Sequence, residues 1–160
     1  MPLHTVENVD LYRYLGKWYE IARSNSWLGH NLCNVTEEYS LNTKGYITII
    51  NTAYIATPTG LKKCSLGYAK VADQTKNSKL RVSFLPRFLK FLDPLLSDHY
   101  WILKLESDYS ITMVGEPRRK CLRILSRSPQ IMLNQYEEYT SAATTMGFDT
   151  KYLHKTLQQW

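Results

Sequence analysis

The side chains of this chain that could perform covalent chemistry are few and scattered. The spacing shows no paired carboxylates and no arrangement of serine, histidine and aspartate typical of a hydrolase. Cys121 lies two positions before Arg123, whose charge would lower the pKa of a neighbouring thiol and favour a nucleophile. No histidine is predicted beside this cysteine. The histidines are His4, His30, His99 and His154. We therefore expect a binding protein rather than an enzyme, with nucleophilic catalysis by Cys121 as the alternative.

The three cysteines, Cys33, Cys64 and Cys121, are an odd number without C-x-x-C spacing. This pattern argues against a metal site, and we expect neither a metal nor a cofactor. At most one disulfide can form, so at least one thiol stays free. Cys33 is either free or paired with Cys64 or Cys121.

Length and composition indicate one folded domain over residues 1–160. Of the 160 residues, 44% are hydrophobic and 21% charged, a balance typical of a globular protein with a real core. The net charge of +6 favours an anionic partner such as an acidic lipid or a fatty acid, although a solvated basic surface explains it equally well. No nucleic-acid-binding motif accompanies the charge, so we expect no nucleic acid partner.

The start of the chain does not resemble a secretion signal. Residues 1–5 lack an apolar core, and no apolar run has the length of a membrane span. Either the chain is not secreted or a leader has been replaced. The first case predicts a cytosolic or peripheral membrane protein, and the second a periplasmic or outer-membrane one.

Two distant segments are predicted to close one end of the structure. Gly16 allows a sharp turn into a strand, and Trp18 then points to one face of that strand. Arg127, more than a hundred residues later, carries a guanidinium that stacks well on an indole. We expect Gly16, Trp18 and Arg127 to form the base of a cup.

Alternating runs at intervals of about ten residues predict an all-β protein, an eight-stranded antiparallel up-and-down barrel spanning about residues 15–127. The expected strands cover 17–25, 34–41, 46–54, 62–72, 79–85, 99–106, 109–115 and 121–127. The period then changes. Ser128 and Pro129 predict the start of a helix over about 129–146, packed outside the barrel, and Gly147 its end. The tail, 148–160, adds a last strand or lies along the surface.

Several segments resemble the lipocalin family, in particular the bacterial and plant-type branch related to apolipoprotein D. The similarity runs from residues 14–23, which read YLGKWYEIAR, through 107–109 to 124–129, ILSRSP. Three motifs in this order, followed by a helix, are specific. The resemblance implies a calyx that binds, stores or transports a fatty acid, a lysophospholipid or a similar lipid, often at a membrane. A few members are isomerases that use a cavity cysteine, which is the form that the Cys121 alternative takes.

Strand alternation predicts which side chains line the cavity. Trp18, Glu20 and Ala22 share one face of the first strand, and Cys121, Arg123, Leu125 and Arg127 share one face of the last. Arg123 is then about 13 Å above the base, at ~3.3 Å per residue. Relatives usually carry tryptophan at this position. We expect Arg123 to bind the carboxylate or phosphate of a lipid; the alternatives are neutralisation by Glu20 and extension to water at the mouth.

Three further side chains are candidates for the ligand site. Asn51 matches a polar position that commonly lines the pocket in the family, although it could instead bond a neighbouring side chain or water. Tyr39 and Trp101 either line the cavity or cover it from outside. Strand parity alone does not decide between these placements.

An apolar segment with interleaved basic residues, 84–96, is predicted at the mouth. Exposed, it would be a liability unless something covers it, and its composition suits an anionic membrane surface. The predicted membrane contacts are Arg87, Phe88, Leu89, Lys90, Phe91 and Leu92. A lid over the calyx and a homodimer interface are the alternatives.

Overall fold

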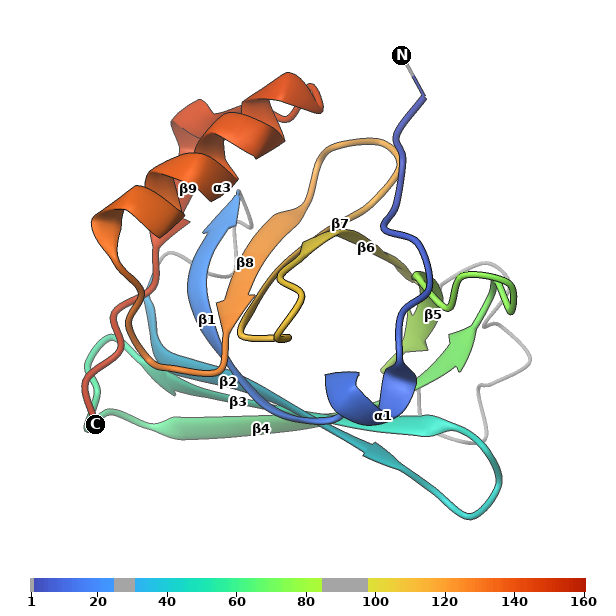
Figure 1. Cartoon of the computed structure of the whole chain (residues 1–160). Coiled ribbons are helices and arrows are strands. Elements are labelled where there is room, and N and C mark those ends of the chain that lie inside the picture. The colour runs from blue at the N-terminus through green and yellow to red at the C-terminus, as the bar shows by residue number, and fades with distance from the viewer. Residues whose placement is uncertain (1, 25–30, 85–97) are drawn as a thin grey trace.

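The computed structural model describes residues 2–24, 31–84 and 98–160, and its strands form a closed barrel. The strand order is β2-β3-β4-β5-β6-β7-β8-β1-β9, and a ladder between β1 and β2 closes the first eight strands into a ring (Figure 1). The strands are β1 Gly16–Ser24, β2 Leu32–Leu41, β3 Ile47–Ile55, β4 Lys62–Val71, β5 Lys79–Ser83, β6 Asp98–Leu105, β7 Ile111–Gly115, β8 Leu122–Ser126 and β9 Leu153–Lys155. The predicted eight-stranded antiparallel barrel is confirmed.

Two apolar layers lie on the two faces of this sheet. The inner layer fills the lower barrel and includes Trp18, Ile49, Leu80, Ile102 and Leu125. The outer layer lies beneath helix α3 (Leu133–Thr145) and includes Met113, Leu122, Ile124, Tyr139 and Ala143. On β8 the two layers alternate residue by residue, as the pleat of a strand requires.

A bulge in β1 changes the face on which later residues point. Glu20 pairs with Leu125 of β8, but Ala22 pairs with Ile124, so Ile21 is an extra residue in β1. Ala22 consequently lies in the outer layer with Ile124. Arg23 pairs with Arg123 and returns to the inner face. The prediction that Ala22 lines the cavity is therefore wrong, because unbroken alternation does not hold across the bulge.

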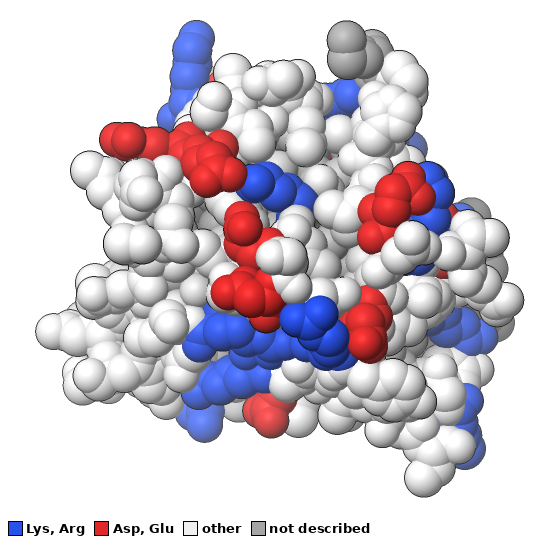
Figure 2. Space-filling model, in the orientation of Figure 1, with Lys and Arg blue, Asp and Glu red and all other residues white. Residues whose placement is uncertain are grey.

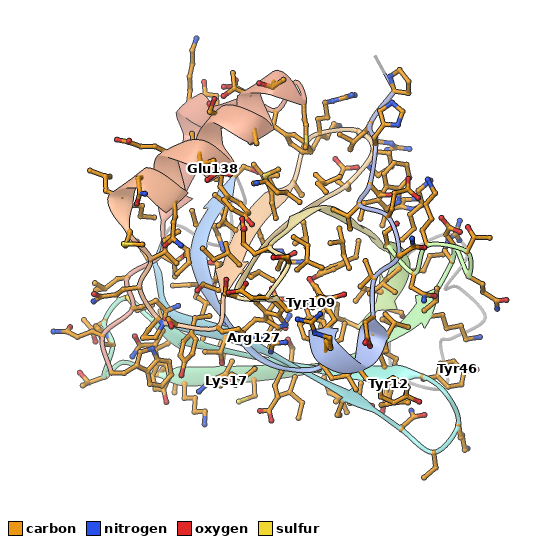
Figure 3. The ribbon with its side chains drawn as sticks, in the orientation of Figure 1. Tyr12, Lys17, Tyr46, Tyr109, Arg127 and Glu138 are labelled. Atoms are coloured by element: carbon orange, nitrogen blue, oxygen red, sulfur yellow. The ribbon has the colours of Figure 1, made fainter. Side chains whose placement is uncertain are left out.

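The base of the barrel is locked by Arg127, in contact with a short helix that the sequence did not predict. This helix, α1 (Leu11–Tyr14), crosses one end of the ring (Figure 1). Arg127 stacks 3.8 Å from the Trp18 ring and donates hydrogen bonds to the carbonyls of Arg13, Leu15 and Lys17 at 2.7 to 2.9 Å. Figure 3 shows Arg127 near Lys17 and Tyr109 at this end of the barrel. Gly16, with φ of +96°, leaves room for the guanidinium, since a Cβ there would lie 3.2 Å from Nη1.

Helix α3 packs on the outside of the barrel but begins later than predicted. Ser128 does not cap it: its backbone N–H bonds the hydroxyl of Ser126, whereas the side chain of Gln135 accepts the N–H of Met132 and fixes the first turn there. Gly147, with φ of +86°, follows the end of the helix as expected. No helix in the described part of the chain is both long and apolar enough to span a bilayer.

The C-terminal tail completes the barrel wall. The ladder between β1 and β2 ends at the pair Tyr19 and Thr36, and above this point the two strands separate into a seam. Residues 153–160 fill the seam: β9 pairs with β1 (Figure 1), and Asn34 of β2 exchanges two hydrogen bonds with the backbone of Gln159, at 2.7 and 2.9 Å. The side-chain amide of Gln158 bridges the strands by donating to the carbonyls of Glu20 and Val35, at 2.9 and 2.8 Å.

We predict that Gln158→Ala destabilises the protein by about 2 kcal/mol, because two buried carbonyls lose their donor. Gln159→Ala is a matched control, since the bonds between residue 159 and Asn34 use only the backbone of residue 159, and it should change stability by less than ~0.5 kcal/mol. Urea unfolding followed by tryptophan fluorescence measures both. Equal stability of the two variants would show that the bridge does not hold the seam.

Candidate ligand-binding site

An ion pair between a buried carboxylate and a partly exposed guanidinium lies inside the barrel, above the apolar inner layer. Arg123 of β8 donates to the carboxylate of Glu37 of β2, and the hydroxyl of Tyr39 donates to the second carboxylate oxygen. The side chain of Glu37 is 2% exposed and that of Arg123 33%. Burying an unpaired charge in this interior would cost free energy. Each charged side chain can therefore occupy the barrel because the other neutralises it.

Three tyrosine hydroxyls extend this pair into the barrel. The hydroxyl of Tyr39 is 3.0 Å from that of Tyr100, which is 2.8 Å from that of Tyr14. The three hydroxyls therefore form a continuous hydrogen-bonded chain that ends at the carboxylate of Glu37. Burial, and then the negative charge of Glu37, raises the pKa of Tyr39 well above its usual value. Burial likewise raises the pKa values of Tyr14 and Tyr100.

The charge on Arg123 is fixed by its surroundings. Burial lowers the pKa of its guanidinium, but the acidic groups around it, with the carboxylate of Glu37 the largest contributor, together outweigh burial and raise the pKa above its usual value. Arg123 is therefore a permanent cation. Its guanidinium also lies 5.7 Å from the centre of the Tyr100 ring.

A second ion pair lies beside the first, at the seam. Glu20 is fully buried and accepts two hydrogen bonds from Arg23, both at 2.7 Å, and one from the hydroxyl of Thr156 at 2.6 Å. The bulge at Ile21 makes this pair, because it places residues three apart on the same face. Glu20 thus forms its ion pair with Arg23. The alternative that Glu20 pairs with Arg123 is wrong, because Arg123 pairs with Glu37.

A small cavity of about 40 Å³ remains among these side chains. Its polar lining comprises Glu37, Tyr39, Asn51, His99, Tyr100 and Arg123, and its apolar lining Ile49, Val82 and Phe84. The amide oxygen of Asn51 is buried there without a hydrogen-bond partner among the described residues. A buried acceptor of this kind favours a donor from outside the protein, either water or a ligand.

The structure brings together three of the predicted ligand-binding residues, Arg123, Asn51 and Tyr39, on the cavity wall. Glu20 lies in the adjoining ion pair. Leu125 is buried in the inner layer and is not among the cavity-lining residues.

Two other predicted positions are corrected. Trp101 contacts the outer layer, because Tyr100 and Ile102 on either side of it point inward; Lys79 lies 4.4 Å from its ring. Cys121 is exposed in the turn before β8 rather than inside the barrel, because the strand begins only at Leu122. In the described part of the chain, Cys33, Cys64 and Cys121 form no disulfide.

Sequence reasoning missed Glu37, the residue that neutralises Arg123. Glu37 and Tyr39 are two positions apart on β2, so placing Tyr39 inside would have placed Glu37 inside as well. Phe84, Tyr100 and His99 were also missed. The predicted membrane contacts, Arg87, Phe88, Leu89, Lys90, Phe91 and Leu92, lie outside the described residues.

A glycine makes room for Phe84 beside the cavity. Its ring lies over Gly67 of β4, where a Cβ would come within 2.6 Å of Cε1. Phe84 is 42% exposed, so its ring lines the cavity and also reaches the surface.

The sequence and the fold of this chain are similar to those of known proteins. The family model described as a lipocalin-like domain matches residues 9–158. Temperature-induced lipocalin-1 of Arabidopsis thaliana is 34% identical over 98% of this chain and 83% of its own length. Outer membrane lipoprotein Blc of Escherichia coli is 35% identical over 90% of this chain and 76% of its own. Among solved structures, insecticyanin of the tobacco hornworm aligns with a TM-score of 0.71 at 19% identity, over 98% of this chain and 84% of that one, which shows the fold alone.

The buried tyrosines predict a loss of stability at alkaline pH. Their pKa values are raised above the unfolded value of 10, so their contribution is complete below pH 10 and is lost as the pH rises further. Each buried tyrosine should cost about 1.4 kcal/mol per pH unit above 10. Unfolding by urea between pH 8 and 11 tests this.

Tyr100→Phe should reduce the fall in the free energy of unfolding above pH 10 by about 1.4 kcal/mol per pH unit, which corresponds to one proton. Tyr12→Phe, at a position 78% exposed, should leave this slope unchanged. If both variants keep the parent slope, the hydroxyl chain does not control the pH response.

Proposed function

This chain belongs to the lipocalin family, whose members bind small hydrophobic ligands, and on that premise we propose that its barrel binds, stores or transports a small lipid. The observation that carries this proposal is the gathering of polar groups at one place in an apolar interior. Arg123, Glu37 and the unsatisfied oxygen of Asn51 meet in one cavity above a packed hydrocarbon layer. Such a site suits a ligand with one polar head and one apolar chain.

The ion pair favours a head that carries both charges. Because Glu37 already neutralises Arg123, a fatty acid must compete with a buried carboxylate for the guanidinium. A lysophospholipid can instead place its phosphate at Arg123 and its ammonium near Glu37. We therefore place a zwitterionic lysophospholipid before a fatty acid as the ligand class.

Binding of a whole lipid requires the cavity to enlarge. The cavity of about 40 Å³ holds little more than one water molecule, which occupies ~30 Å³, whereas pockets for small molecules have ~300 Å³ or more. Phe84 is the side chain best placed to move, since its ring rests on Gly67 and is partly exposed. Rotation of this ring toward solvent would join the cavity to the mouth.

Binding is favoured over catalysis by the lining itself. None of the three cysteines is among the cavity-lining residues of the described chain, and Cys121 is exposed. The cavity instead presents a neutralised ion pair and an acceptor, which recognise a polar head without providing a free nucleophile.

Membrane contact is the second part of the proposal. The segment 84–96 carries Phe88, Leu89, Phe91 and Leu92 with Arg87 and Lys90 between them, a composition suited to an anionic lipid surface. The name of the bacterial relative, an outer membrane lipoprotein, supports a location at a membrane. A lid over the mouth and a homodimer contact are the other uses of the segment that the test below separates.

The head-group proposal predicts that Arg123→Met weakens binding of palmitoyl lysophosphatidylethanolamine at least tenfold and leaves binding of monopalmitoyl glycerol within twofold. The double variant Glu37→Gln/Arg123→Met removes both charges, so no unpaired buried carboxylate destabilises the fold. Calorimetric titration measures both ligands. Unchanged affinity for the phospholipid in both variants would overturn the assignment, and failure of every lipid to bind the parent protein would overturn the function.

Membrane contact predicts that Phe88→Asp and Phe91→Asp abolish pelleting with vesicles that contain phosphatidylglycerol. Leu66→Asp, at a position 50% exposed on β4, is the matched control and should pellet like the parent protein. A lid predicts altered ligand binding with unchanged pelleting, and a dimer contact predicts a change in sedimentation coefficient without vesicles.

A further inference from the structure

A groove of about 460 Å³ lies on the outer side of the barrel, more than ten times the volume of the inner cavity. One wall comes from the start of α3 and the segment before it, through Ile131 and Leu133. The other wall comes from the tail, through Leu157, and Ile21 of β1 also lines it. Figure 1 shows helix α3 and the C-terminus bordering this flank.

Half of the residues that line the groove are aliphatic, counting proline, and the two leucines among them are exposed; Gln130, Thr156 and Gln158 supply neutral polar groups. Leu133 is 64% exposed and Leu157 53% exposed, and Met132 beside them is 64% exposed. Figure 2 shows few charged side chains on the flank between α3 and the C-terminus. Exposed apolar side chains grouped around a hollow mark a binding surface rather than random surface composition.

One positive charge stands at the edge of this apolar surface. Lys155 is the only charged residue among those lining the groove in the described structure, and its ammonium lies 4.2 Å from the centre of the Tyr136 ring. None of the ion pairs among the described residues includes Lys155. The groove therefore offers an apolar trough with a single uncompensated cation.

We propose that this groove is a second ligand site, which binds one single-chain amphiphile with an anionic head. The chain lies between Leu133 and Leu157, and the head group pairs with Lys155. This site is separate from the cavity proposed above, because it lies on the opposite side of the barrel wall. Its volume is in the range of small-molecule sites, about 300 to 1,000 Å³, and one cation matches one carboxylate or sulfate.

Dodecanoate is the probe for this site, titrated into the full chain labelled with ¹⁵N. We expect the amide resonances of Leu133, Lys155 and Leu157 to shift with one saturable affinity. Dodecyltrimethylammonium, which has the same chain and the opposite charge, should bind there at least tenfold more weakly. Equal affinity of the two amphiphiles would overturn the role of Lys155.

Variants separate the groove from the inner cavity. Leu133→Glu should weaken dodecanoate binding at the groove at least tenfold, while Leu66→Glu, also at an exposed leucine, should leave it within twofold. Lys155→Glu should reverse the preference for the anionic probe, with Lys62→Glu as its control.

Two outcomes would overturn the groove site: shifts confined to residues of the inner cavity, or the same affinity in Leu133→Glu and Leu66→Glu. The double variant Glu37→Gln/Arg123→Met leaves the groove intact and should preserve the shifts at Leu133. Failure of the inner site is therefore visible independently of the groove.

Discussion

Closure of the barrel is the constraint on which the rest of this structure depends. β1 and β2 pair over only four residues, Gly16 to Tyr19, and a sheet left open above that point would expose two unpaired edges. Arg127 secures the lower end by joining carbonyls of the segment before β1 to the end of β8. The tail secures the upper end, where Gln158 supplies donors to both edges. Residues from both ends of the chain must therefore be in place before the wall is complete.

Closure of the barrel also places charged side chains in its interior, where each pairs with a side chain of opposite charge. Two arginines and two glutamates face inward near the seam, and each cation has its own carboxylate: Arg123 with Glu37, and Arg23 with Glu20. Because the sum is zero, the barrel attracts no net charge at this depth. It presents instead a strong local dipole and the amide oxygen of Asn51, which has no partner among the residues that the structure describes. Recognition at such a site depends on the arrangement of charges in a ligand more than on its total charge.

The sequence was sufficient for the eight-stranded barrel, but not for helix α1, and only partly sufficient for the site. Strand number, order and the inward position of Arg123 follow from turn signals and a period of two, which are local properties. The prediction that Ala22 lines the cavity was wrong because the bulge at Ile21 depends on pairing with β8, which is about a hundred residues away in the sequence. Helix α3 began late because Gln135, inside the helix, determines its first turn. The partner of Arg123 was missed because β2 and β8 are neighbours of β1 and not of each other, so their side chains meet only across the barrel.

The tail gives the two candidate sites a shared wall. Thr156 donates to buried Glu20 on the barrel side, and the same residue lines the outer groove together with Gln158. At the seam, the tail is thus the segment that lies between buried Glu20 and the outer groove. The ladder between β1 and β2 ends at Tyr19 and Thr36. Beyond it, the side-chain amide of Gln158 donates hydrogen bonds to both strands in place of a direct backbone pair. The stretch of wall beyond the end of the ladder between β1 and β2 is therefore also the part that contacts both the buried charges and the groove.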